Sequence, residues 1–487
     1  MLAPVSVCLL ASCAASRFLP DEQRVESYAP FGKRQVDSEY AETVAAETSA
    51  SEVVQAESLA EDLQPNPALI SEPETEPSSS EDIVPILFAS EVVEFAVKGD
   101  SLTLADLENF ALESNPTLAQ AAASVDRSQG NWLQVGLYPN PTMGYQASEV
   151  GNEGHFGQQG VYFEQEFVTA GKLGLSRHAA NHAWEKERFA LQAQQQRVLT
   201  SVRISFYKTL IAREAVELSE KLLETSDRGL KATEAMLAAK QASQVDLLQS
   251  RIERNNARVL LRQAQNRLQA AWQRLTSFVG RDDLDQSQLV GNVKPDLKEL
   301  DGSEILAAML LESPQLGAAQ QEVARARAAI ERAQVEPTPN VLAQVGTQYD
   351  TSTNYTVANV QIGFALPIFN CNQGNIQMAQ AELISAEWEL ERIRLDLKNR
   401  LAPVLENHQN ARVELTQYSE SILPDAKSSL DLVTQGYQQG QFGFLRFLTA
   451  QRTYFQTNLD YLKSQQKWWT ASIQIEGMLL NGGLETP

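Results

Sequence analysis

Few residues of this sequence have types and spacing suited to chemistry. His178 and His182 lie four residues apart, which would place both imidazoles on one helix face, where they could bind zinc. A protein zinc site needs at least three protein ligands, and no third is evident, so we interpret the pair as polar residues on a solvated helix. The sequence shows no phosphate-binding glycine loop, nucleophile elbow or paired-carboxylate motif. We therefore expect no enzyme, no metal centre and no cofactor.

Composition excludes further classes of protein. Acidic residues number 62 against 40 basic ones, so the field of the whole chain repels nucleic acid. Apolar runs such as 7–11 and 84–89 are far shorter than the roughly 18 residues that a transmembrane helix needs. Three cysteines do not make a disulfide framework.

Cys13 is the one residue whose surroundings indicate a covalent modification. Residues 10–13 read Leu-Ala-Ser-Cys after a short apolar run, which is similar to a bacterial lipobox. The motif predicts that 1–13 is a lipoprotein-type signal segment and that Cys13 is acylated. Residues 1–7 contain no Lys or Arg, so either the true start lies further upstream or the match arises by chance. One acyl chain binds a membrane only marginally, so firm attachment must come from elsewhere in the chain.

The segment 14–100 carries much of the negative charge. It contains 19 acidic and 5 basic residues, with tracts of Glu, Ser, Pro and Ala and few aromatic residues. Such a composition buries too little apolar area to offset the entropy of an ordered chain. We expect a disordered acidic linker.

The rest of the chain reads as two copies of one unit. Pro139 and Pro141 recur 198 residues later as Pro337 and Pro339, and a Trp-Glu-x-Glu-Arg motif recurs 204 residues later. We therefore expect a first repeat at 101–285 and a second at 302–483.

Each copy switches hydrophobic period twice. A helix is expected over 104–137, with Thr103 as its N-cap, an interruption near Pro116 and an end at Pro139. Alternating apolar residues predict β-hairpins at 140–169 and 340–369. Each strand has about ten residues, the length of a tilted membrane-spanning strand.

Long helix pairs are expected at 170–280 and 375–480. In the first pair, Val198, Val202, Phe206 and Leu210 recur at four-residue steps, and about 65 helical residues span roughly 100 Å. After a break near Ser243, an apolar stripe predicts the coiled-coil seam of the returning helix. Its residues are Val245, Leu248, Ile252, Asn255 and Val259. Pro403 and Pro424 predict kinks in the second descending helix.

Two hairpins supply four strands, whereas the smallest closed membrane barrel needs about eight. Unpaired strand edges in lipid cost several kcal/mol per polar group, so the hairpins of several chains must share one barrel. The predicted fold is mainly α with membrane β, a trimeric β-barrel continued by an α-helical barrel. The rival is a periplasmic coiled-coil adaptor or structural protein whose strands form a small cap; a soluble cap would bury the apolar face of its strands.

This organisation resembles the TolC family of outer membrane efflux proteins. The local matches are Gly440, Phe442-Gly443-Phe444 and Ala450-Gln451-Arg452. The resemblance implies a homotrimeric, passive duct in the outer membrane lipid with a periplasmic extension. Its partners would be a periplasmic membrane fusion (adaptor) protein and an inner-membrane efflux pump. The lipobox and the sequence Phe442-Gly443-Phe444-Leu445 resemble lipoprotein channels of resistance-nodulation-division pumps, including the heavy-metal branch, more than they resemble the protein-secretion branch. A type I protein secretion channel is the alternative, and the cargo stays open between metal ion, drug and polypeptide.

The resemblance also implies which residues form the pore tip. The family's first-copy aspartate falls on Asp246 and its second-copy tyrosine on Tyr437, while its two constricting second-copy aspartates fall on Arg446 and Thr449. These four are candidates for a tip gate. Asp246 and Arg446 occupy equivalent places in the two copies, so neighbouring helix pairs could close the tip with alternating charges.

Adaptor contact is expected at the turns between the long helices. The family's second-copy turn glycine falls on Gly440, and its first-copy counterpart falls on Lys240. With Gly443, these residues are the candidates for adaptor contact.

Overall fold

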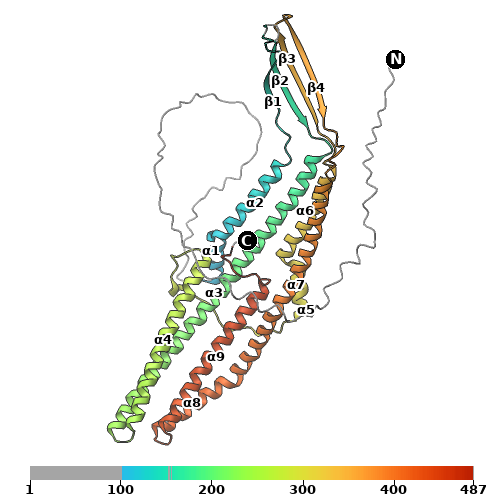
Figure 1. Cartoon of the computed structure of the whole chain (residues 1–487). Helices are drawn as coiled ribbons and strands as arrows, with labels where there is room; N and C mark the ends of the chain where they lie inside the picture. Colours follow the sequence, from blue (N-terminus) through green and yellow to red (C-terminus); the bar gives the residue numbers. More distant parts are fainter. Residues whose placement is uncertain (1–100, 152–153, 155, 486–487) are drawn as a thin grey trace, which may run out of the picture. The chain divides into compact units, whose positions relative to one another are not determined.

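The computed structural model describes residues 101–151, 154 and 156–485, so the signal segment with Cys13 and the acidic segment 14–100 lie outside the described residues. Figure 1 shows the strands at one end of this part and the turns between long helices at the other. The helices of its first half are α1 (Leu104–Ser114), α2 (Pro116–Gln134), α3 (Lys172–Ala238), α4 (Gln244–Val279) and the 3-10 turn η3 (Gln286–Gln288). Those of its second half are α5 (Gly302–Glu312), α6 (Pro314–Val335), α7 (Gln373–Gln417), the π-helix η4 (Tyr418–Ile422), α8 (Leu423–Gln438) and α9 (Phe444–Glu476).

The helix expected over 104–137 forms as α1 and α2, with the interruption at the position that Pro116 predicts. Thr103 caps α1 in a capping box with Asp106. Asn115 ends α1 in an extended conformation, and its side-chain oxygen accepts a hydrogen bond from the Thr117 amide at 2.9 Å. Pro116 occupies the first position of α2, where a missing amide donor has no cost. The break therefore follows from an Asn cap combined with proline.

Helix α3 is the central element of the described chain. Its 67 residues correspond to roughly 100 Å. Along one part of its length α3 packs against α2 and α6, and along the other part it packs against α4 and α9. Val198, Val202 and Phe206 are buried in the largest apolar cluster, as the four-residue period predicts. The cluster also includes residues of α1, α4 and the segment after α4.

The two hairpins form one antiparallel sheet in the order β1–β2–β3–β4. The strands are β1 (Thr142–Ser148), β2 (Gln158–Phe167), β3 (Val341–Asp350) and β4 (Tyr355–Phe364). The hairpins join through β2 and β3, where Phe163 pairs with Val345. Strands β1 and β4 each pair on one side only within the sheet.

The prediction that the apolar stripe on α4 forms a buried seam is wrong for the described part of the chain. Val245, Leu248 and Ile252 are 60%, 50% and 58% exposed. The residues of α4 that are buried in its middle and tip portions are instead Leu247, Ser250, Glu253, Ala257 and Ala264. The apolar stripe thus exists, but it faces away from α3.

The two prolines of the second long helix behave differently. Pro403 lies inside α7, whose helical run continues past it to Gln417, so no break occurs there. Pro424 lies two residues after the end of the π-helix η4, in the first turn of α8. Because proline lacks an amide donor and clashes with the preceding turn, the wider π turn accommodates it. No helix in the described part of the chain is long and apolar enough to span a membrane.

Candidate functional site

One face of the sheet is apolar and exposed. The cross-strand pairs Tyr145–Val161 and Val345–Val360 place their side chains on this face. Tyr145 is 64% exposed and Val360 is 71% exposed, and no other described element covers them. Other exposed members are Met143, Phe163, Phe167, Ile362 and Phe364. A water-soluble cap would bury this face.

The opposite face of the sheet is polar and acidic. Glu164 and Glu166 of β2 and Asp350 of β3 alternate with the apolar residues. The four strands contain neither Lys nor Arg. The acidic groups therefore share one face of the sheet, which also carries Leu342, Tyr355 and Val357, and the opposite face has no charged group.

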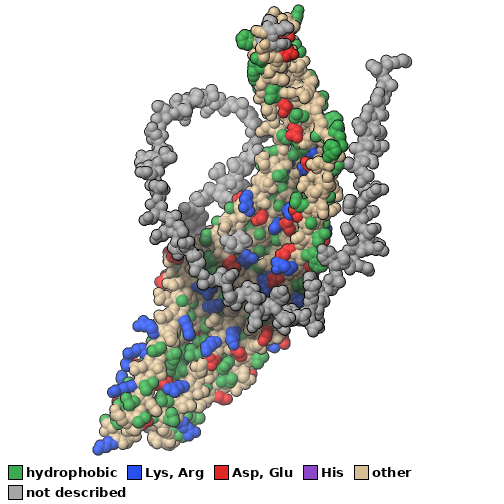
Figure 2. Space-filling view, in the orientation of Figure 1, with side chains coloured by type: hydrophobic (Ala, Val, Ile, Leu, Met, Phe, Trp, Pro, Cys, Tyr) green, Lys and Arg blue, Asp and Glu red, His purple; other side chains and the backbone are tan. Residues whose placement is uncertain are grey.

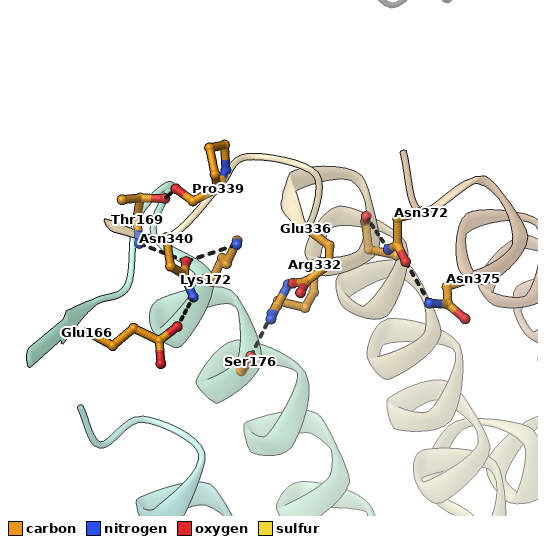
Figure 3. Close-up of polar contacts among 11 residues, drawn as sticks. Glu166, Thr169, Lys172, Ser176, Arg332, Glu336, Pro339, Asn340, Asn372 and Asn375 are labelled. Carbon is orange, nitrogen blue, oxygen red and sulfur yellow. Dashed lines mark hydrogen bonds and ion pairs between the residues drawn. The ribbon is translucent and has the colours of Figure 1, made fainter. Parts of the chain in front are cut away.

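A polar network joins the two hairpins where they meet the helices (Figure 3). Asn340, just before β3, donates from Nδ2 to Oε1 of Glu166 at 2.7 Å, and its Oδ1 accepts from Nζ of Lys172 at 3.0 Å. The hydroxyl of Thr169 donates to the carbonyl of Pro339 at 2.7 Å. Residues 166–172 of the first half are thus bonded directly to residues 339–340 of the second.

Polar contacts also join the helices below the sheet to one another. Nε of Arg332 donates to the Ser176 hydroxyl at 2.8 Å, joining α6 to α3, and Arg332 also forms an ion pair with Glu336. Nδ2 of Asn372 donates to the carbonyl of Ala333 at 2.8 Å, which attaches the start of α7 to α6. These contacts hold the sheet and the upper helices together.

The two turns at the opposite end share one backbone geometry. In the first, the carbonyl of Met236 accepts from the amides of Gln241 and Ala242; in the second, the carbonyl of Gly436 accepts from those of Gln441 and Phe442. Lys240 (φ 58°) and Gly440 (φ 72°) both adopt the left-handed conformation that ends the descending helix. The structure therefore supports the predicted equivalence of positions 240 and 440.

The residues that follow these turns differ in chemistry. Ser243 caps α4 in a capping box, in which its amide and hydroxyl donate to Oδ2 of Asp246 at 2.9 and 2.7 Å. Gly443, its counterpart, offers no side-chain cap to α9. The guanidinium of Arg446 lies 4.6 Å from the ring centre of Phe442. Asp246 and Arg446 form no ion pair with each other within the described chain.

The other two gate candidates lie apart from this pair. Tyr437 is buried, stacks on Phe447 with ring centres 5.2 Å apart, and places its hydroxyl 3.3 Å from the sulfur of Met236. It therefore joins α8 to α3. The hydroxyl of Thr449 donates to the carbonyl of Leu445 within its own helix, and Thr449 is exposed. Lys240, Gly440 and Gly443 are exposed on the turns.

Two contacts that sequence reasoning missed join the helix pairs above the turns. Arg452 of α9 donates from Nε to Oε2 of Glu253 on α4 at 3.1 Å. Nε2 of Gln451 donates to the buried hydroxyl of Ser226 on α3 at 3.2 Å. Gln451 and Arg452 belong to the matched motif Ala450-Gln451-Arg452, which was the available signal. Their partners are far away in sequence, so spacing alone did not reveal them.

Exposed apolar residues mark both edges of the long helices. At one edge is the stripe on α4; at the other, Leu395 and Val413 of α7 and Leu432 of α8 are 61%, 65% and 66% exposed. Trp388 of α7 is 71% exposed, whereas Trp184, 204 residues earlier, packs on Trp132 with ring centres 5.8 Å apart. Since α4 packs on α3 and α8 packs on α9, these edges lie on opposite sides (Figure 1).

Charge is distributed unevenly along the described chain. Blue side chains of Lys and Arg gather over the lower helices in Figure 2. Helix α4 alone carries six arginines but only two acidic residues, Asp246 and Glu253.

His178 and His182 contact each other edge-on, and Nδ1 of His182 lies 2.9 Å from Oε1 of Gln321. No group of three potential metal ligands occurs among the described residues.

Comparisons with known proteins agree with this geometry. The model of the outer membrane efflux protein family matches residues 107–281 and 305–479. The cobalt-zinc-cadmium resistance protein CzcC of Cupriavidus metallidurans is 28% identical over 382 residues, covering 78% of this chain and 90% of the relative.

Solved structures show the same fold. A crystal structure of CusC has a TM-score of 0.67 at 20% identity, covering 78% of this chain and 92% of that one. The open state of the MtrE outer membrane channel of Neisseria gonorrhoeae has a TM-score of 0.64 at 19% identity, covering 79% and 90%.

Proposed function

The chain belongs to the outer membrane efflux protein family, and from this premise we propose that it is the passive outer membrane duct of a tripartite efflux system. Three chains form the duct. An inner-membrane pump supplies the energy, and a periplasmic adaptor protein connects the pump to the helical end of the duct. The duct itself carries out no reaction.

The observation that carries this proposal is the incomplete amphipathic sheet. Four strands leave β1 and β4 with open edges, and the apolar face is uncovered. In a membrane the open edges must be paired and the apolar face belongs against lipid. Three chains supply twelve strands, an even number within the range of closed membrane barrels. The acidic face then lines the lumen. The same observation counts against the soluble coiled-coil rival.

The edges of the helices support a ring of the same symmetry. The exposed stripe on α4 and the exposed residues of α7 and α8 lie at opposite edges of one chain. Two different surfaces that meet head to tail generate a closed ring when the rotation closes. Joining the α4 edge of one chain to the α7–α8 edge of the next continues the barrel downward as a helical tube.

We regard the two halves as copies of one ancestral unit. Both contain two short helices, a hairpin and a long antiparallel helix pair. The two matches of the family model are also offset by 198 residues, the spacing of the repeated prolines. In this arrangement each trimer has six equivalent turns at its lower end.

The roles of individual residues follow from this placement. The exposed turn residues Lys240, Gly440 and Gly443 contact the adaptor, and acylation of Cys13 adds a lipid anchor. Within a chain, Tyr437 and the Glu253–Arg452 pair hold one helix pair against the other. Between neighbouring chains, Asp246 and Arg446 act as a charge latch that the adaptor releases. The name of CzcC suggests metal cations as one class of cargo.

A disulfide experiment tests the trimer. Leu248 and Leu432 each lie eight residues from the equivalent turn positions 240 and 440, at opposite edges of the chain. Leu248→Cys with Leu432→Cys, in a background with Cys8, Cys13 and Cys371 all replaced by serine, should give covalent dimers and trimers after oxidation, and nothing larger. Each single-cysteine variant is the control and should stay monomeric on a denaturing gel. A double variant that stays monomeric, or a ladder beyond three chains, contradicts the trimer.

Single-channel conductance tests the latch. Arg446→Ala should raise the conductance of the closed state, because opposite charges at a partly solvated site contribute about 0.2–1 kcal/mol per pair. Arg251→Ala, an exposed arginine elsewhere on α4, is the matched control. A closed state that is unchanged in Arg446→Ala rules the latch out.

A further inference from the structure

A cavity of about 450 Å³ lies over α3, between α4 and α9. Its floor is apolar and includes Ile211, Ala215, Leu260, Ala264 and Leu462. The volume falls within the range of small-molecule sites, which are commonly apolar with a few polar groups at defined positions. The surface therefore has room for a small organic molecule.

The rim of this groove is positively charged. Lys208 of α3, Arg267 and Arg274 of α4 and Lys463 of α9 line it. Lys463 is paired with Asp460 at 2.8 Å. The other three make no hydrogen bond and no ion pair with any residue in the described part of the chain. Three cations thus share one groove without a counter-ion.

Lys208 makes this arrangement costly for the free protein. It is half-buried, and burial, followed by the positive charge of Arg274, lowers the pKa of Lys208. Removing an ammonium from water next to a like charge is unfavourable unless an opposite charge compensates it. A bound anion would supply that compensation.

The groove opens on the face of α3 that no further layer of the described residues covers. On the other face, Phe206 and Leu210 pack against Gly291, and Arg213 donates to the carbonyl of Leu289 at 2.7 Å. Lys208 follows Phe206 by two residues, which turns its side chain by about 200° around the helix axis. In a closed helical tube, the segment around Gly291 that packs on this other face of α3 must lie outside the tube, because it would otherwise fill the passage. The groove then faces the lumen.

We propose that this groove binds organic anions with an apolar body, such as aromatic carboxylates or sulfonates, as they pass along the duct. The proposal rests on the duct function proposed above, because that function places the groove in the lumen. The apolar floor accommodates the body of the ligand, and Lys208, Arg267 and Arg274 bind its charged group.

Binding of naphthalene-1-sulfonate to trimers in phosphatidylcholine nanodiscs tests the proposal, with 1-naphthylmethylamine as the cation of the same shape. Titration calorimetry should show saturable binding of the sulfonate at one site per chain and no binding of the amine. The triple variant Lys208→Gln, Arg267→Gln, Arg274→Gln should bind the sulfonate about tenfold or more weakly, because it removes the cations that hydrogen-bond the sulfonate group.

A matched triple variant controls for the loss of charge. Arg251→Gln, Arg258→Gln and Arg262→Gln remove three exposed arginines of α4 that do not line the groove. Its affinity should stay within about twofold of the wild type. Equal weakening in both triple variants, equal binding of sulfonate and amine, or no saturable binding overturns the proposal. If the groove triple variant does not assemble, Arg274→Gln alone replaces it and should still weaken binding.

Bilayer conductance of the same preparation separates this proposal from the duct function. Trimers that conduct but do not bind the sulfonate refute the anion groove and leave the duct intact. Protein that binds the sulfonate but neither assembles nor conducts refutes the duct and the lumenal placement of the groove.

Discussion

The two lower turns of the molecule have the same backbone and different side chains. Lys240 and Gly440 hold the same left-handed position, and the same pair of amide-to-carbonyl bonds closes each turn. The first turn leads into a capped helix with Asp246, whereas the second leads from Gly443 into an uncapped helix with Arg446. The turn geometry depends on backbone hydrogen bonds, so it survives wide differences in side-chain chemistry.

The comparison teaches that each turn is stabilised in its own way. The second has an apolar cluster in which Tyr437, Phe444, Phe447 and Leu448 pack together. The first has the Ser243 capping box and tolerates a strained lysine. Substitutions at equivalent positions should therefore have unequal effects, and hydrogen exchange of the amides near each turn measures that inequality directly.

The largest effect is expected in the apolar cluster. Phe447→Ala should destabilise the second turn by about 3–5 kcal/mol, because it leaves a cavity beside Tyr437 and Phe444. Hydrogen exchange around residues 430–450 should accelerate accordingly. Leu247→Ala, the equivalent change, should cost less, since Leu247 belongs to no such cluster among the described residues. Equal costs at the two positions would remove this distinction between the turns.

Capping provides the next largest difference. Ser243→Ala should cost the first turn about 1 kcal/mol, because it removes the side-chain acceptor for the Asp246 amide. Gly443→Ala, at the equivalent position, should be neutral or slightly stabilising, since φ is −73° and an added Cβ meets nothing within 4 Å. Exchange rates of the first-turn amides of α4 and α9 provide the measurement. A loss at Gly443→Ala that matches Ser243→Ala would contradict the asymmetry.

The left-handed position should respond in opposite directions in the two turns. Lys240→Gly should stabilise the first turn by about 0.5–1 kcal/mol, because the steric cost of a left-handed side chain exceeds the added chain entropy of glycine. Gly440→Lys should destabilise the second turn by a similar amount. Thermal unfolding in detergent, combined with local exchange, measures both. Changes of the same sign in the two variants would show that the positions are not equivalent.

The smallest effect is expected for the ion pair that joins the two helix pairs. Glu253→Gln and Arg452→Gln should show a coupling of about 0.5 kcal/mol in a double-mutant cycle, because the Arg452 side chain is 61% exposed and water screens it. The coupling should fall as salt is raised. Arg251→Gln supplies the uncoupled control. A salt-independent coupling would mean that packing, rather than charge, joins the helix pairs here.

Much of the fold could be predicted from local patterns. The four-residue period of Val198, Val202 and Phe206 identified the buried face of α3, and two-residue alternation identified the strands. Periodicity shows which residues share a face, but not which element meets that face. The stripe on α4 was therefore found correctly, but the described part of the chain does not bury it. The contacts of Glu253 with Arg452 and of Ser226 with Gln451 were missed because they join residues 199 and 225 apart in the sequence.

The sequence by itself determined that the chain contains two hairpins and two long helix pairs, because period and proline positions act locally. It also determined that four strands are too few to close a membrane barrel. Only the tertiary structure decided that Tyr437 is buried against α3, that Asp246 bonds to its own helix cap, and that the α4 stripe is exposed. The physical reason is that a side chain's partner depends on how distant helices pack, and no local period specifies that packing.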